Sequence, residues 1–124
     1  LITADTVVCI HDRILGKPAD RKEAISMLRK LSGNRHLVVT GVSVTTRTEQ
    51  LSFSSRTDVF FKHLSNEEII FYVDTYKPFD KAGAYGIQEW IGYIGIERIE
   101  GSFYNVMGLP IQKLYETLRK LQFQ

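Results

Sequence analysis

The stretch HLVVTGVSVTTRTEQLSFSSRTDVFF, residues 36–61, decides the fold, because it holds two long runs rich in β-branched and aromatic residues. Val42 and Val44 alternate with Ser43 and Thr45. This period of two is typical of a strand that turns one face toward a core. The pattern therefore predicts strands over roughly 36–47 and 51–62, joined as a hairpin or meander.

Two other segments also have strand character. ITADTVVCI, residues 2–10, is rich in β-branched residues and is predicted to be a largely buried strand. The following HDRILGKP, residues 11–18, is predicted to be a turn because Gly16 and Pro18 interrupt it. A further strand is expected within IERIEGSFYNVMG, residues 96–108.

Helices are predicted over roughly 19–33, 64–76 and 109–124. In the first, Asp20 is a candidate N-cap, Glu23 completes a capping box and Gly33 ends the helix. In the second, Ser65 and Glu68 repeat the capping-box pattern. In the third, Pro110 suits the first turn. The residues expected to line one face of this last helix are Ile111, Leu114, Tyr115, Leu118 and Leu121.

Strands combined with three helices predict an α/β protein, a mixed sheet with flanking helices, in one domain over residues 1–124. Sixteen basic residues against 14 acidic ones are too balanced to favour nucleic acid or a membrane as a partner. No apolar run approaches the ~18 residues of a membrane span, so we expect a cytoplasmic protein. The single cysteine, Cys9, is expected to be a small buried hydrophobic residue.

Asp5 is the first candidate functional residue. An ionised carboxylate within an apolar strand is costly unless it is paired, hydrogen-bonded or bound to a metal. The residue types alone leave two interpretations open, a functional acid or a structural Asp at a strand end.

Lys17, in the GKP turn, could meet Asp5 or an anionic ligand, although a lysine in a turn is commonly just solvated. The loop DKAGAYGIQ, residues 80–88, is a further candidate. Its glycines allow close backbone approach, Lys81 could meet a phosphate, and the amide of Gln88 could read a base edge. The loop matches neither the Walker pattern nor the dinucleotide fingerprint, so alone it could also be only a connection.

The histidines do not form a cluster in the sequence. His11, His36 and His63 lie in separate segments without ligand spacing, which argues against a zinc site. Trp90 and the segment 102–105 could stack on a base, but packing is the alternative role.

Five segments in the same order resemble the Maf family of nucleoside triphosphate pyrophosphatases. They are ADTVV, LGKPAD, EAISMLRKLSGNRHLVVTGV, DKAGAYGIQ and GSFYNVMGLP, and they extend over essentially the whole chain. The resemblance implies the Maf/Ham1 (inosine triphosphatase-like) fold, in which two lobes of a long sheet enclose a nucleotide cleft. It also implies hydrolysis between the α- and β-phosphates of a nucleotide, with Mg²⁺ or Mn²⁺.

Carried over to this sequence, the resemblance implies that Asp5 is the proton acceptor near the metal and a metal ligand. Thr6 and Gln88 fall on positions tied to base selection, and the pair resembles the subgroup that acts on dTTP and UTP. Lys17 and Lys81 match two motif lysines that are expected to contact phosphate, with Lys17 assigned to the catalytic set. Homodimers are common in the family, so a homodimer is possible.

Family members begin with an S-x-S-P-R-R loop whose arginines are thought to bind the phosphates. This chain starts at ADT, so we interpret it as the C-terminal two-thirds of the family domain. Without the arginine loop, this part alone is not expected to have the full activity. Two other functions are weighed: a non-catalytic interaction module, linked to septum formation, and the same enzyme class acting on purine or methylated nucleotides.

Overall fold

The hairpin predicted over residues 36–61 forms the centre of the sheet in the computed structural model, which describes residues 1–122. Its strands are β3 and β4, and the sheet order is β2-β1-β3-β4-β5. The elements in chain order are β1 (Ile2–Ile10), β2 (Arg13–Leu15), α1 (Arg21–Leu31), β3 (Arg35–Thr45), β4 (Gln50–Phe61), α2 (Asn66–Tyr76), the 3₁₀ turn η1 (Ala82–Ala84), α3 (Trp90–Gly95), β5 (Ile96–Glu100), α4 (Phe103–Val106) and α5 (Ile111–Gln122).

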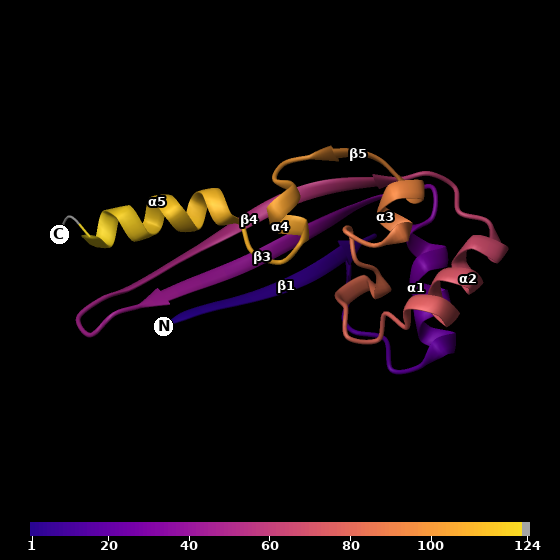
Figure 1. Cartoon of the computed structure of the whole chain (residues 1–124), viewed down its shortest axis with the longest axis horizontal. Coiled ribbons are helices and arrows are strands. Elements are labelled where there is room, and N and C mark those ends of the chain that lie inside the picture. The colour runs from indigo at the N-terminus through magenta and orange to yellow at the C-terminus, as the bar shows by residue number, and fades with distance from the viewer. Residues whose placement is uncertain (123–124) are drawn as a thin grey trace.

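The α/β architecture with helices flanking a sheet is confirmed. The sequence predicts a mixed sheet, whereas the four strand pairings in the described chain are all antiparallel. The molecule is elongated (Figure 1): α1 and α2 gather at one end of the sheet, and α5 lies along the β3–β4 hairpin toward the other end.

The predicted N-terminal caps of the first two helices agree with the structure, with one difference, while the last two residues of the third predicted helix, 123 and 124, lie outside the described residues. Ser65 and Glu68 form the full capping box of α2. Asp20 caps α1 by accepting a hydrogen bond from the Glu23 backbone N–H. The Glu23 carboxylate, however, accepts from the N–H of Ala19 at 3.3 Å, so the reciprocal bond of a capping box to Asp20 is replaced by one to the preceding residue.

Three predictions about the first strands are wrong. The strand at residues 2–10 is not largely buried, because its first four residues are exposed, and Cys9 is only half-buried. Residues 13–15, predicted to be part of a turn, form β2, which pairs with the end of β1. His11 and Asp12 take positive φ between these strands and make the connection short enough for a hairpin.

The sheet carries two separate apolar cores on one face. The large core joins that face to α1, α2 and α3, with Leu28, Val59 and Tyr72 among its fully buried members. The arm core lies farther along the hairpin, where Val42 and Val44 pack against Leu114 of α5. Leu118 and Leu121 complete this face of α5, whereas Ile111 and Tyr115 are exposed, so the predicted apolar face is too wide.

Buried polar residues separate the two cores. Thr40 of β3, Ser55 and Thr57 of β4 and Asn105 of α4 are each at most 6% exposed. We call these four residues the polar layer. The Asn105 amide group donates to the backbone oxygens of Val38 and Ser55 and to Thr57 Oγ1, at 2.9–3.2 Å. This side chain therefore ties α4 to both strands of the hairpin.

Candidate active site

A pocket of about 250 Å³ opens beside the polar layer, between β1, the loop around η1 and the end of α4. Its lining residues, in chain order, are Asp5, Thr6, Val8, Lys17, Val38, Asp80, Lys81, Ala82, Tyr85, Gly86, Ile87, Gln88, Val106, Met107 and Gly108. The five residues that the sequence analysis selected for the site thus line one pocket, although they come from three distant segments. Their individual roles remain predictions.

Asp5 and Thr6 both reach the pocket because the edge of β1 is open beside them. The side chains of neighbouring strand residues point to opposite faces of the sheet, so a pocket on one face alone would contact only one of the two. β2 pairs only with Val8–Ile10 of β1, and within residues 1–122 no strand pairs with this edge at Asp5 and Thr6. The pocket lies at this edge and both residues line it.

The glycine-rich loop is attached next to Lys17. The Gly83 N–H donates to the Gly16 oxygen at 3.1 Å, so the loop lies against the GKP turn. Gly83 has a φ of 72°, and a Cβ at this position would lie 3.1 Å from the side chain of Val8. Both the positive φ and the close approach to β1 call for glycine. The motif glycine therefore joins two segments that the sequence keeps far apart.

Lys81 is held in place on the loop wall, by which we mean the pocket side formed by residues 80–88. Its Nζ lies 3.1 Å from Asp80 Oδ1 and 3.5 Å from Glu89 Oε1. Burial disfavours the ammonium charge, but the hydrogen bond to Asp80 and the charge of Glu89 outweigh this and raise the pKa of Lys81. The hydrogen bond from Lys81 lowers the pKa of Asp80. The pocket thus holds a fixed cation.

Tyr72 of α2 supports the same wall from behind. Its hydroxyl donates to Glu89 Oε1 at 3.0 Å and accepts from the Gly86 N–H at 3.1 Å. Burial raises the pKa of Tyr72, so the hydroxyl keeps the proton that it donates. A cation, a carboxylate, a phenol and a backbone amide are therefore connected in one network.

His36 lies behind Tyr85, which lines the pocket. Its Nε2 is 2.6 Å from the hydroxyl of Tyr85, and its ring stacks on Phe61 at 5.5 Å between centroids. Burial lowers the pKa of His36 to about 4, so the ring is neutral at pH 7. Burial also raises the pKa of Tyr85. His36 is therefore a packing residue behind the pocket lining.

The opposite side, which we call the strand wall, consists of Asp5 and Thr6 on β1 and Lys17 in the turn after β2. Asp5 and Lys17 are exposed, and in the described chain neither side chain forms a hydrogen bond or an ion pair within 4.0 Å, although the charge of Lys17 helps to lower the pKa of Asp80. Thr6 differs, because its Oγ1 lies 2.9 Å from Thr40 Oγ1. The charged groups of this wall are free to meet a ligand.

A divalent cation fits this pocket only as an ion shared with a substrate. No three His, Cys, Asp or Glu side chains of residues 1–122 are grouped so that they could hold a metal. Mg²⁺ ordinarily keeps several waters and binds through one or two carboxylates together with substrate phosphates. Asp5, an exposed carboxylate on the pocket wall, matches that kind of donor set.

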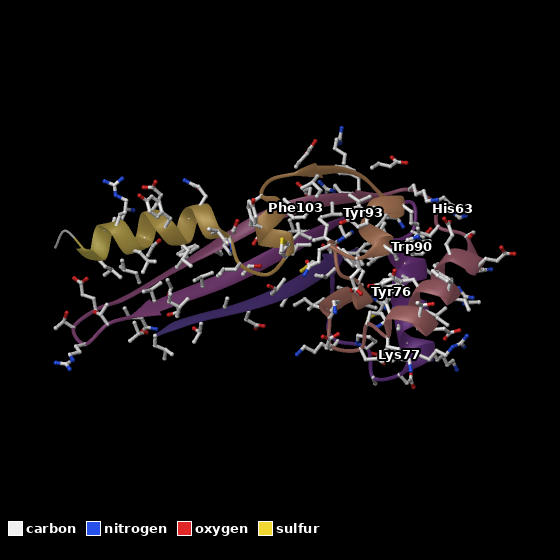
Figure 2. The ribbon with its side chains drawn as sticks, in the orientation of Figure 1. His63, Tyr76, Lys77, Trp90, Tyr93 and Phe103 are labelled. Atoms are coloured by element: carbon white, nitrogen blue, oxygen red, sulfur yellow. The ribbon has the colours of Figure 1, made fainter. Side chains whose placement is uncertain are left out.

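The aromatic residues considered for base stacking lie elsewhere. Trp90 is half-buried against Phe71, with ring centroids 4.9 Å apart. In Figure 2, Trp90 and Tyr93 lie on α3, whereas Phe103 lies on α4 over the hairpin. None of them is part of the pocket lining. Asn105, in the same 102–105 segment, is buried in the polar layer.

Sequence reasoning missed the residues that hold the selected ones in place. Thr40 looks like one more alternating strand residue, and Tyr72 like part of an apolar helix face. Glu89 directly follows the glycine-rich motif but belongs to no pattern that indicates chemistry. Asp80 is different, because it stands inside the quoted motif and could have been chosen together with Lys81.

The antiparallel sheet with flanking helices, and a charged pocket between the β1 edge and a glycine-rich loop, agree with the α/β class that the motifs suggested. Comparison with known families gives the particular group. The model of the Maf-like protein family matches residues 1–121, and the chain belongs to this family.

Curated relatives agree with this assignment. The chain is 62% identical over 121 residues to a Bacteroides thetaiotaomicron protein named dTTP/UTP pyrophosphatase, covering 98% of this chain and 63% of that protein. A Porphyromonas gingivalis protein of the same name is 63% identical over 119 residues, covering 96% and 60%. A Cytophaga hutchinsonii protein of that name is 52% identical over 121 residues, covering 98% and 56%. The chain thus spans about 60% of the length of these relatives.

One further property concerns membranes. Among the helices of residues 1–122, none has both the length and the apolar character required to cross a bilayer.

Proposed function

We propose that the protein hydrolyses dTTP and UTP to the nucleoside monophosphate and pyrophosphate. The observation that carries the proposal is the meeting of Asp5, Thr6, Lys17, Lys81 and Gln88 in one pocket. The name shared by relatives that are 52–63% identical supports the choice of substrate.

The charges of the pocket suit a triphosphate. Lys17 and Lys81 line the pocket from its two walls, so the negative charge of a bound triphosphate can be complemented from both sides. Lys81 is already positioned by Asp80 and Glu89, whereas Lys17 is free to adjust. Asp5 is a suitable general base, because it is exposed and has no competing partner in the described chain.

Mg²⁺ or Mn²⁺, when bound, would supply charge neutralisation at the phosphate oxygens. Asp5 would hold the ion, with the substrate and water providing the other oxygens. Base selection then belongs to Thr6 and Gln88, which line the pocket with uncharged polar groups.

The test is a nucleotide panel on the full-length protein. We expect dTTP and UTP to be hydrolysed faster than purine or 7-methylated nucleotides, with one pyrophosphate released per nucleotide. Chelation of divalent ions should abolish the reaction, and added Mg²⁺ or Mn²⁺ should restore it. Release of orthophosphate in place of pyrophosphate, or a preference for purine nucleotides, would contradict the proposal.

A further inference from the structure

The Thr6 hydroxyl is the start of a hydrogen-bonded series that leads from the pocket into the polar layer. Thr6 Oγ1 lies 2.9 Å from Thr40 Oγ1, and Thr40 is 0% exposed. Thr40 Oγ1 in turn donates to the backbone oxygen of Asn105 at 3.2 Å. We call Thr6, Thr40 and Asn105 the relay.

The relay has a direction. A hydroxyl has one hydrogen to donate. When Thr40 donates to the Asn105 oxygen, its own oxygen can only accept, so the hydrogen of Thr6 must point at Thr40. The reverse arrangement, with Thr40 donating to Thr6, would lose the bond to Asn105. Because each buried hydrogen bond adds stability, the arrangement that makes both bonds is favoured.

Asn105 is fixed firmly enough to impose this direction. It is 0% exposed, and its side-chain amide nitrogen lies within hydrogen-bond distance of three acceptors on β3 and β4. Its backbone oxygen also accepts the Gly108 N–H at 3.0 Å, which keeps that carbonyl oriented within the turn after α4. The far end of the relay is therefore an acceptor that cannot rotate away.

The near end faces the pocket. Thr6 lines the pocket, and so does Gly108, where an added Cβ would lie 3.7 Å from Thr6 Oγ1. The absence of a side chain at Gly108 keeps access to the hydroxyl open. With its hydrogen directed at Thr40, Thr6 Oγ1 offers only lone pairs to a ligand.

We propose that Thr40 and Asn105 fix Thr6 as a hydrogen-bond acceptor. The relay thereby selects uracil and thymine against cytosine. The inference rests on the proposed function, because it assumes that a pyrimidine nucleotide occupies the pocket. Uracil and thymine carry a hydrogen on N3, which can donate to Thr6. Cytosine has a lone pair at N3, which would face another lone pair. Thr40 and Asn105 are positioning residues that need not touch the base.

The decisive variant is Thr40→Val, which keeps the shape of the side chain and removes the hydroxyl. It releases the hydrogen of Thr6, which can then donate to N3 of cytosine. We expect the ratio of UMP to CMP affinity, measured by calorimetry on the full-length protein, to fall at least tenfold, which corresponds to about 1.4 kcal/mol. Thr40→Ser keeps a hydroxyl and should retain the ratio of the unsubstituted protein.

Ser55→Ala is the matched control. Ser55 pairs with Thr40 across β3 and β4 and is also buried, but only its backbone oxygen contacts Asn105. It should leave the UMP to CMP ratio unchanged. If the ratio falls equally in Ser55→Ala and Thr40→Val, loosened packing explains the effect and the proposal is overturned.

A second measurement does not depend on the folding of any variant. Pseudoisocytidine monophosphate keeps the amino group of cytosine but has a hydrogen on N3. It should bind the unsubstituted protein at least fivefold more tightly than CMP. Equal binding of these two ligands, equal binding of UMP and CMP, or no binding of UMP would each overturn the proposal.

Hydrolysis is scored separately from binding. If UMP is selected through Thr40 but UTP releases no pyrophosphate, the proposed function fails and the relay stands. If pyrophosphate is released from UTP but Thr40→Val binds UMP and CMP in the original ratio, the relay fails and the proposed function stands.

Discussion

The loop wall of the pocket holds its charged groups by internal bonds, whereas the strand wall leaves its charged groups free. Lys81 contacts Asp80 and Glu89, and Tyr72 supports Glu89 from the large core. Asp5 and Lys17 have no such partners in the described chain. A charged side chain that is already held by other residues, such as Lys81, suits the binding of a phosphate, which every nucleotide substrate carries. Side chains without such bonds, such as Asp5 and Lys17, suit roles that begin only when the substrate binds.

The largest expected effect is on the strand wall. Asp5→Asn should lower kcat for dTTP about 100-fold or more, the usual contribution of a general base. Its stability should stay within about 0.5 kcal/mol of the original, because the side chain is exposed and unpaired. Pyrophosphate release and thermal unfolding measure the two effects. Asp12→Asn, in the exposed turn after β1, is the control, and a rate loss below tenfold in Asp5→Asn would show that another group is the base.

The next effect concerns the support of the loop wall by His36. Because burial lowers the pKa of His36 to about 4, the unfolded chain takes up a proton near pH 6.5 that the folded protein does not. Stability is therefore lost as the pH falls from about 6.5 to 4, by about 3 kcal/mol from this group. Urea unfolding at several pH values measures it.

His36→Gln should reduce this pH dependence by that amount, while His63→Gln, at an exposed position, should keep it. An identical pH dependence in the protein and in His36→Gln would mean that His36 is not a neutral buried group.

A smaller effect is expected from loosening Lys81. Glu89→Gln removes one of the two carboxylates beside the ammonium group, while Asp80 stays. We expect KM for dTTP to rise about tenfold with kcat nearly unchanged, the result of weaker ground-state and transition-state binding alike. Glu97→Gln, an exposed carboxylate on β5, serves as the control. A fall in kcat without a change in KM would place Glu89 in the chemical step.

The smallest effect tests the space around the same lysine. A Cβ at Gly86 would lie 2.5 Å from Glu89 Oε1 and 2.9 Å from Lys81 Cε. Both are ends of flexible side chains, so Gly86→Ala should cost little stability. It should displace Lys81 and raise KM about threefold to fivefold. Combined with Glu89→Gln, the increase should be less than the product of the single effects, since both act through Lys81. Multiplicative effects would show that they are independent.

The sequence was informative where local patterns decide the structure. Alternation located β3 and β4, and capping residues located α1 and α2 to within a few residues. The motif residues were chosen in separate segments, and the fold brings them into one pocket. Local patterns could not show that β1 is open at Asp5, because strand pairing is set by distant segments. They also could not show that Thr40 meets Asn105, 65 positions along the chain.

The polar layer has a consequence for how the molecule fluctuates. It divides the buried face into a large core and an arm core that, among residues 1–122, has three buried members, Val42, Val44 and Leu114. Few buried apolar contacts mean a low free energy of local opening. The amide hydrogens of α5 should therefore exchange with solvent well before those of α1, by opening events that leave the pocket intact.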